Sequence, residues 1–308
     1  MRLRMVEFLL VAAVAWMPGR ALAEKPARPF PDIEHVVIIS LDGMRPDRML
    51  LANMPTMRGL IARGAYTFWA RTTAMSITLP SHVSMLTAVT PQKHGIYWNS
   101  ELALKEPIYP AYPSIFEMAR RAGYTTAMVA GKAKFNTLDK PGTIQWVSVP
   151  NKTAEENEPI VEEADAIIRD HKPEVLFIHF AEVDSRGHKF GWASPEQLTS
   201  IERTDGHVKS VMDALAAAGI AEHTVVILTS DHGGAGKTHG PDDPRSRHIP
   251  WIIVGPHVKH GDLTALPELV VNTEDTCATA CYLLGLSQLP YFDGKPVLAA
   301  FENPPVPQ

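Results

Sequence analysis

Five short, nearly continuous apolar runs constrain the fold of this chain more than any other feature. The runs are HVVIISL (35–41), TTAMVAG (125–131), VLFIHF (175–180), TVVILTS (224–230) and PWIIVG (250–255). Runs without regular polar positions are typical of strands that are buried on both faces of a sheet. Between them lie helix-like patterns near 53–64, 80–88, 113–122, 154–170, 195–218 and 273–284. This alternation predicts an α/β fold with a mostly parallel central sheet and helices on both faces.

The two ends of the 308-residue chain do not resemble parts of such a domain. Residues 1–23 combine two early arginines, an apolar stretch and the tripeptide ALA, which is the pattern of a cleavable secretory signal peptide. We therefore expect a periplasmic or secreted protein, and no other segment is long and apolar enough to span a membrane. The further boundaries that we predict are an N-terminal extension (24–33), a single folded domain (34–300) and a flexible tail (301–308).

Charge and cysteine content argue against two classes of protein. The 29 basic and 34 acidic residues give a formal net charge of −5, whereas a general nucleic-acid binder carries an excess of basic residues. The two cysteines, Cys277 and Cys281, lie four positions apart on an expected helix, where a disulfide has awkward geometry. We expect small buried core residues at these positions rather than a disulfide framework.

Acidic and imidazole side chains follow three of the apolar runs. Asp42 follows the first run, Asp184 and His188 follow the third in DSRGH, and Asp231 and His232 follow the fourth in TSDHGG. Open α/β sheets bind ligands at the carboxyl ends of their strands. A carboxylate there is costly unless it is paired or bound to a metal ion, so we expect metal ligands. A simple turn cap at the strand end is the alternative for Asp42.

The spacing within these segments predicts local geometry. We expect DSRGH, with its internal glycine, to form a tight loop that turns its aspartate and its histidine onto one ion. Adjacent residues on an extended strand point to opposite sides, so the DH pair can share an ion only if the backbone turns. Gly233 and Gly234 would allow that turn. The third imidazole is expected to be His239 in KTHG, with His248 as the alternative.

A hydroxyl nucleophile is expected in SITLPSH. Pro80 suits the first turn of a helix, so Thr78 should lie just ahead of that helix, where backbone N–H groups and the helix dipole favour an anion. Ser76 and Ser81 are rival hydroxyls, and a plain helix N-cap is the alternative to a nucleophile. The combined segments supply three carboxylates, three imidazoles and one hydroxyl, which suffice for two metal ions with the hydroxyl as nucleophile.

These ordered segments resemble the alkaline phosphatase superfamily, and most of all its type I phosphodiesterase/nucleotide pyrophosphatase branch. The resemblance runs over residues 34–296, and TLPSH followed by TPQKHGI is similar to the nucleophile region of that branch. It implies a hydrolase of phosphate esters with two Zn²⁺ ions, for which Mn²⁺ or Fe are alternatives. On the family pattern one ion is held by Asp42, Asp231, His232 and the Thr78 oxygen, and the other by Asp184, His188 and His239.

The resemblance also implies a reaction path. Thr78 attacks phosphorus, a phospho-threonine forms, and water then hydrolyses it. Asn99, in HGIYWN, falls where the family keeps an asparagine that donates to a phosphoryl oxygen. Lys132 and Lys134, in VAGKAKFNT, resemble the Lys-x-Arg pair of alkaline phosphatases that cleave monoesters with a threonine nucleophile, although Lys134 replaces the arginine. Two solvated loop lysines are the alternative.

The sequence does not decide between several related reactions, all of which would act on a small phosphate ester such as a nucleotide. A phosphodiesterase or nucleotide pyrophosphatase is the first reading, and a phosphomonoesterase or a phosphonate hydrolase of the same fold is the alternative. A sulfatase is disfavoured because Thr78 stands where a convertible Cys or Ser is needed, and His82 stands in place of the arginine. An exported protein that binds a metal or an anion without catalysis is the alternative from another class.

Overall fold

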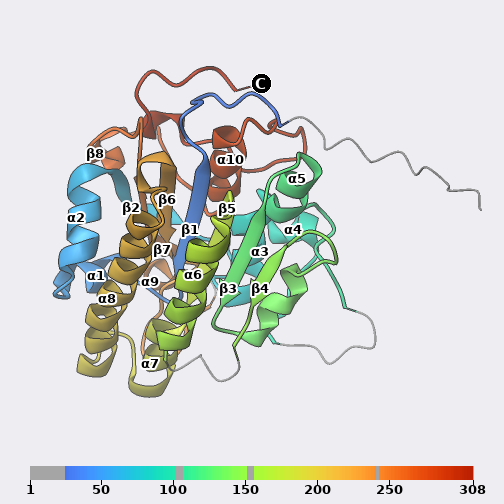
Figure 1. Ribbon diagram of the computed structural model, residues 1–308. Helices are drawn as coiled ribbons and strands as arrows, with labels where there is room; N and C mark the ends of the chain where they lie inside the picture. The colour runs from blue at the N-terminus through green and yellow to red at the C-terminus, as the bar shows by residue number, and fades with distance from the viewer. Residues whose placement is uncertain (1–24, 101–106, 151–155, 241–242, 308) are drawn as a thin grey trace, which may run out of the picture.

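One eight-stranded sheet organises the protein in the computed structural model, which describes residues 25–100, 107–150, 156–240 and 243–307 (Figure 1). The signal-peptide prediction for residues 1–23 lies outside the described residues. The strands are β1 (His35–Leu41), β2 (Ala65–Arg71), β3 (Thr126–Ala130), β4 (Trp146–Ser148), β5 (Val175–Phe180), β6 (Thr224–Thr229), β7 (His248–Val254) and β8 (Gly261–Asp262). Their order in the sheet is β4-β3-β5-β1-β6-β7-β2-β8.

The sheet is mostly parallel, as the sequence predicted. The strand β7 is antiparallel to both of its neighbours, β6 and β2, and the other pairings are parallel. The five apolar runs became β1, β3, β5, β6 and β7. The remaining strands were missed for simple reasons. In β2 buried positions alternate with more exposed ones, and β4 and β8 are short edge strands of three and two residues.

Helices cover both faces of this sheet. They are α1 (Pro46–Leu51), α2 (Pro55–Arg63), α3 (Thr78–Thr87), α4 (Pro91–His94), α5 (Ile115–Arg121), α6 (Glu158–His171), α7 (Glu182–Phe190), α8 (Pro195–Ala217), α9 (Pro244–Arg247) and α10 (Glu274–Leu283). The six predicted helices correspond to α2, α3, α5, α6, α8 and α10. The described residues contain no helix whose length and apolar character would suit a membrane crossing.

The central strand β1 shows why the two faces are both covered. Its side chains alternate between two apolar clusters, so that Val36 and Ile38 pack with α3, α5 and α10, whereas Val37 and Ile39 pack with α2, α6 and α8. All four side chains are at most 1% exposed. Burial on both faces explains the continuous apolar run in the sequence and confirms the predicted fold class.

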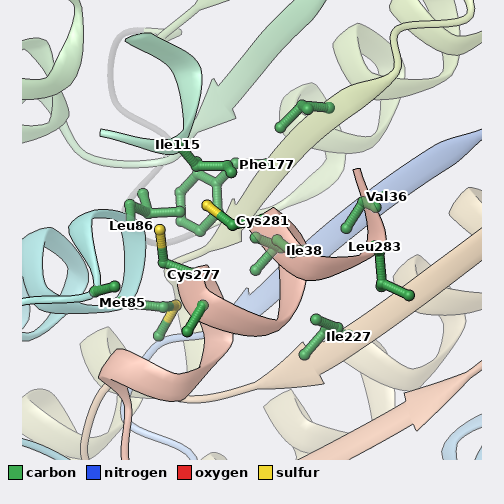
Figure 2. Packing of buried hydrophobic residues seen from close by; sticks show 14 of the residues in the cluster. Val36, Ile38, Met85, Leu86, Ile115, Phe177, Ile227, Cys277, Cys281 and Leu283 are labelled. Atoms are coloured by element: carbon green, nitrogen blue, oxygen red, sulfur yellow. The ribbon is translucent and has the colours of Figure 1, made fainter. Parts of the chain in front are cut away.

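The two cysteines belong to the first of these clusters. Cys277 and Cys281 lie on α10, are fully buried, and are free thiols rather than a disulfide. Figure 2 shows them beside Leu86 of α3 and Phe177 of β5, with Ile38 beneath α10. The prediction of small core residues is confirmed. Within the predicted tail (301–308), Phe301 is buried and forms a bridge with Val258.

Replacement of Ile38 by alanine should strongly destabilise the fold. The side chain is fully buried in the central strand, and truncation of such residues costs about 2–5 kcal/mol of unfolding free energy because a cavity remains. Urea unfolding followed by circular dichroism measures the change. Leu51→Ala is the matched control, because Leu51 is 65% exposed and should change the unfolding free energy by less than about 0.5 kcal/mol. Equal effects in the two variants would contradict the described packing.

Candidate metal centre

Three buried aspartates meet at the carboxyl ends of three adjacent strands, β5, β1 and β6. Asp42 follows β1, Asp184 lies in the first turn of α7 after β5, and Asp231 follows β6. Each of the three is at most 3% exposed. The backbone N–H of Gly43 donates to Asp231 Oδ1 (3.1 Å), which ties the ends of β1 and β6 together. The predicted gathering of acids at one sheet edge is therefore what the structure shows.

Asp184 and His188 belong to the same cluster, but the local structure that carries them differs from the one predicted. The expected tight loop is wrong, because DSRGH forms part of the helix α7. Residues four apart on a helix share one face, and His188 Nε2 lies 3.4 Å from Asp184 Oδ1. The side chain of Asn157 caps this helix by accepting hydrogen bonds from the N–H groups of Ala181 and Glu182 (3.1 and 3.3 Å). That cap comes from a distant segment, so the local sequence did not reveal the helix.

His239 completes this first ligand group. Its Nε2 lies 3.8 Å from Asp184 Oδ1, and the donor atoms of Asp184, His188 and His239 all lie within 4.8 Å of one another. His248 lies instead at the start of β7, where its ring packs edge-on against Trp69. The structure thus places His239, and not His248, beside Asp184.

A second ligand group surrounds His232. Its Nε2 lies 3.2 Å from Asp231 Oδ2 and 3.4 Å from Asp42 Oδ1. The donor atoms of Asp42, Asp184 and His232 also lie within 4.8 Å of one another. Asp184 is shared by both close groups, so the two groups are neighbours, and the rings of His232 and His239 stack at 3.7 Å.

The three imidazoles are all held in the same way. In His188, His232 and His239 the Nδ1 atom lies against a backbone carbonyl, which can only accept a hydrogen bond, so Nδ1 carries the proton. The carbonyls belong to Lys237 (3.0 Å), Gly233 (2.8 Å) and Ser76 (2.8 Å). Each Nε2 is left with a lone pair toward the carboxylates. This anchoring is typical of histidine ligands of metal ions.

The facing carboxylate oxygens lack hydrogen-bond donors. Asp42 Oδ1, Asp184 Oδ1 and Asp231 Oδ2 are buried and accept no hydrogen bond from the described residues. Lone pairs of oxygen and nitrogen therefore face one another in a buried space, which is unfavourable without a cation between them. A set of imidazole nitrogens and carboxylate oxygens is a donor set that suits transition-metal ions.

The ionisation of these groups agrees with a cation-binding role. Burial, followed by repulsion from Asp42, raises the pKa of Asp231 well above its ordinary value. Burial also opposes ionisation of Asp42, but Lys132 and a hydrogen bond from His179 hold its pKa well below the ordinary value. Burial lowers the pKa of His232 to about 3, so its imidazole is neutral near pH 7. A divalent cation would favour the ionised form of Asp231.

Thr78 is the candidate hydroxyl that faces this cluster. It is the first residue of α3, one position further into the helix than predicted, and its Oγ1 lies 3.3 Å from His232 Nε2. The rival hydroxyls are occupied elsewhere. Ser81 donates to the Asp231 carbonyl (2.7 Å) and Ser76 donates to the Thr73 carbonyl (3.2 Å).

Asn99 lies beside the start of α3 with one end of its amide fixed. Its Oδ1 accepts hydrogen bonds from the Leu79 N–H (3.0 Å) and from Lys134 Nζ (3.1 Å). Both donors engage the oxygen, so the NH₂ group remains as the donating end of the amide.

Lys132 lies deeper than a solvated loop lysine. Its side chain is 12% exposed, and Nζ contacts Asp42 Oδ2 (2.5 Å) and Asp184 Oδ2 (2.6 Å). Burial opposes its charge, but these two carboxylates raise its pKa. The Lys132 ammonium thus bridges Asp42 to Asp184, the carboxylate that both ligand groups share.

Two buried histidines, His82 and His179, lie behind the cluster, and His179 was missed from the sequence. His179 accepts from the Gly131 N–H (3.2 Å) at Nδ1, so its Nε2–H donates to Asp42 Oδ2 (2.9 Å). His82 donates from Nδ1 to the Thr78 carbonyl (2.8 Å). The signal for His179 was present, because it is the one polar residue within the apolar run VLFIHF.

The two glycines of TSDHGG are needed because other atoms pack closely against them, and not because the backbone has an unusual conformation there. Neither Gly233 nor Gly234 has a positive φ, which corrects the predicted reason for them. A Cβ atom on Gly233 would lie 2.2 Å from the Arg245 carbonyl oxygen, and one on Gly234 would lie 2.3 Å from the indole of Trp192. Strand β6 ends at Thr229, before Asp231 and His232. These two residues are therefore not held on opposite faces of an extended strand, and both side chains reach the cluster.

Comparison with known proteins gives a family match, several relatives and a shared fold. Residues 36–239 match the family described as type I phosphodiesterase/nucleotide pyrophosphatase. A pyrophosphatase/phosphodiesterase of Schizosaccharomyces pombe, described as uncharacterized, is 27% identical over 217 residues, which cover 65% of this chain and 44% of that protein. Human ectonucleotide pyrophosphatase/phosphodiesterase family member 1 is 27% identical over 223 residues, which cover 64% of this chain and 23% of that protein. The chain therefore spans less than half the length of these two relatives.

A solved structure shares the fold. Murine ectonucleotide pyrophosphatase/phosphodiesterase 5, as an inactive variant in complex with AMP, superposes with a TM-score of 0.71. The sequences are 16% identical, and the superposition covers 87% of this chain and 100% of that chain. At this identity the likeness establishes the common α/β fold.

Removal of His239 should weaken metal binding, whereas removal of His248 should not. In the structure His239 Nε2 faces Asp184, and His248 packs on Trp69 instead. After both variants are loaded with Zn²⁺, we expect His239→Ala to lose metal during dialysis and His248→Ala to retain as much as the wild type. Elemental analysis of the dialysed proteins gives the metal content per chain. Loss of metal from the His248 variant alone would contradict the assignment.

Proposed function

The chain belongs to the type I phosphodiesterase/nucleotide pyrophosphatase family, and we propose that it hydrolyses phosphodiester or pyrophosphate bonds of nucleotide-like substrates with Thr78 as the nucleophile. Two relatives are named as pyrophosphatases and phosphodiesterases. A solved protein of the same fold is in complex with AMP. These names support a nucleotide-like substrate for this chain.

One observation carries the proposal. Thr78 is the first residue of α3, and its Oγ1 lies 3.3 Å from His232 Nε2. The same cluster contains the carboxylate oxygens that accept no hydrogen bond from the described residues. The N-terminus of a helix presents backbone N–H groups and a partial positive charge, which favour an anion at this point. A phosphoryl group and a nucleophilic oxygen would therefore both be stabilised at the same place.

Seven side chains would supply donor atoms for two metal ions. One ion would be held by Asp42, Asp231, His232 and Thr78, and the other by Asp184, His188 and His239. Imidazole-rich sites favour Zn²⁺, and Mn²⁺ or Fe accept similar donors. When bound, the ions would supply Lewis acidity that favours an ionised hydroxyl and offsets charge on phosphoryl oxygens.

The residues of the chain would carry the reaction in two displacements. The Thr78 oxygen forms a bond to phosphorus as the bond to the leaving-group oxygen breaks, which gives a phospho-threonine. Water then attacks the same phosphorus and releases Thr78 and phosphate monoester. Asn99 is held through Oδ1, so its NH₂ group can donate to a phosphoryl oxygen and orient it for attack.

Hydrolysis of phosphomonoesters is the second candidate, and the position of Lys134 favours it. Lys134 Nζ lies 3.1 Å from Asn99 Oδ1, so an ammonium stands beside the group that would contact phosphate. A monoester carries an additional negative charge that such a cation would stabilise. Lys132 would contribute in the same way only if its ammonium reached the phosphoryl group from its position between Asp42 and Asp184.

We also propose export of the mature protein. The support is the signal-peptide pattern of residues 1–23, together with relatives named as ectonucleotide enzymes. N-terminal sequencing of protein recovered from the periplasm or the medium should begin at Glu24. A sequence that begins at Met1 in a protein retained inside the cell would contradict export.

Replacement of Thr78 by alanine should lower kcat by about three orders of magnitude or more, because the nucleophile is lost. The variant should retain nearly all its metal, since the aspartates and imidazoles remain. Ser76→Ala and Ser81→Ala are the matched controls, because they remove the rival hydroxyls and should keep most of the turnover. Wild-type activity in the Thr78 variant would exclude this mechanism.

Replacement of Lys134 by glutamine should separate the two substrate classes. Loss of one charged hydrogen bond of about 1.5–3 kcal/mol should lower kcat/KM for p-nitrophenyl phosphate about 10- to 100-fold if a monoester is the substrate. The value for bis-p-nitrophenyl phosphate should change much less. Equal and small changes for both compounds, with the diester preferred by the wild type, would exclude the phosphomonoesterase.

A further inference from the structure

Trp192 lies at the junction of three segments that carry candidate metal ligands, and the proposed reaction does not use it. It is 6% exposed in the turn between α7 and α8. Gly191 (φ 107°) and Ala193 (φ 77°) flank it, so the backbone φ is positive on both sides. For alanine such a conformation is unfavourable, and it persists only where surrounding contacts compensate for it.

Two hydrogen bonds connect Trp192 to distant parts of the chain. The indole Nε1–H donates to the carbonyl of Gly43 (2.9 Å), directly after Asp42 at the end of β1. The backbone N–H of Trp192 donates to the carbonyl of Gly236 (2.7 Å), in the loop after β6 that carries two of the imidazoles. Trp192 therefore joins the turn after α7 to the ends of both β1 and β6.

The indole also packs against two of the imidazoles. Its ring lies 5.1 Å from the ring of His188 at 84°, and 5.8 Å from the ring of His239 at 66°. These edge-to-face contacts are favourable arrangements for aromatic rings. Among the ring contacts of the described residues, the indole meets these two imidazoles and not His232.

Two glycines make room for this indole. A Cβ atom on Gly187, inside α7, would lie 2.8 Å from Trp192 Cδ2, and one on Gly234 would lie 2.3 Å from Cε2. Atoms do not approach this closely, so any side chain at either position would push the ring away. The separation between α7 and the loop after β6 is thus set by the thickness of one indole.

We propose that Trp192 is a positioning residue that holds His188 and His239 in place around Asp184 and thereby sets the metal affinity of that ligand group. The inference rests on the proposed metal centre. Residues that orient ligands without touching the ion change metal affinity about 10- to 100-fold when they are replaced. The group around His232 should be affected less, because the indole reaches Asp42 and Asp231 only through the backbone of Gly43, whereas it packs directly on His188 and His239.

The test compares two tryptophan variants. Trp192→Phe removes the Nε1–H and part of the ring, and Trp251→Phe does the same in the core. Trp251 is fully buried on β7, and its Nε1–H donates to Thr276 Oγ1 (3.2 Å). Titration with Zn²⁺ against a chromophoric chelator measures both affinities in each variant. We expect one of the two ions to bind about 10- to 100-fold more weakly in Trp192→Phe, and both to bind normally in Trp251→Phe.

A second variant keeps the test decisive if Trp192→Phe does not fold. Gly187→Ala leaves the tryptophan in the chain but displaces its ring, so it should weaken the same ion. Because both changes act through one indole, the double variant should lose less affinity than the product of the two single losses.

The outcomes separate this inference from the proposed function. Folded Trp192→Phe protein with two wild-type affinities would overturn the role of Trp192 and leave the metal centre intact. If that variant does not fold, folded Gly187→Ala protein with two wild-type affinities would overturn it in the same way. Fully multiplicative losses in the double variant would also overturn it. Wild-type protein that binds no Zn²⁺ would contradict the metal centre itself, and the inference with it.

Discussion

Three buried carboxylates at one edge of the sheet are the constraint on which the rest of the structure depends. Asp42, Asp184 and Asp231 are held together because β5, β1 and β6 are adjacent and parallel. Lys132 bridges the first two, yet one oxygen of each aspartate still lacks a hydrogen-bond donor among the described residues. A buried polar atom without a partner costs about 1–3 kcal/mol, more when it is charged. The fold therefore holds a set of groups that additional positive charge would stabilise.

The surroundings of these carboxylates restrict their movement from several sides. His179, on β5, donates to Asp42, and the Gly43 N–H donates to Asp231. Backbone carbonyls fix the protonated nitrogen of each of the three imidazoles, so that every Nε2 faces the acids. Trp192 fills the space between α7 and the loop after β6. Donors that are already oriented before the ion arrives need little reorganisation, which favours both tight metal binding and catalysis.

Much of this arrangement could be predicted from the sequence, and the failures have physical reasons. Continuous apolar runs identified the buried central strands. The polar residues after these runs identified the segments with candidate ligands, because open α/β sheets bind ligands at the carboxyl ends of their strands. The helical state of α7 was not predictable locally, since its cap is Asn157, some 25 residues earlier. The reason for Gly234 was also hidden, because the ring that excludes a side chain there belongs to Trp192. Tertiary contacts of this kind leave no periodic signal in the sequence.

Anomalous X-ray diffraction from crystals of the Zn²⁺-loaded protein tests the central claim most directly. The account predicts two separate zinc peaks at the carboxyl ends of β1, β5 and β6. One peak should lie among Asp42, Asp231, His232 and the Thr78 oxygen, and the other among Asp184, His188 and His239. A single peak, or peaks at other places on the protein while these seven side chains remain without metal, would contradict it.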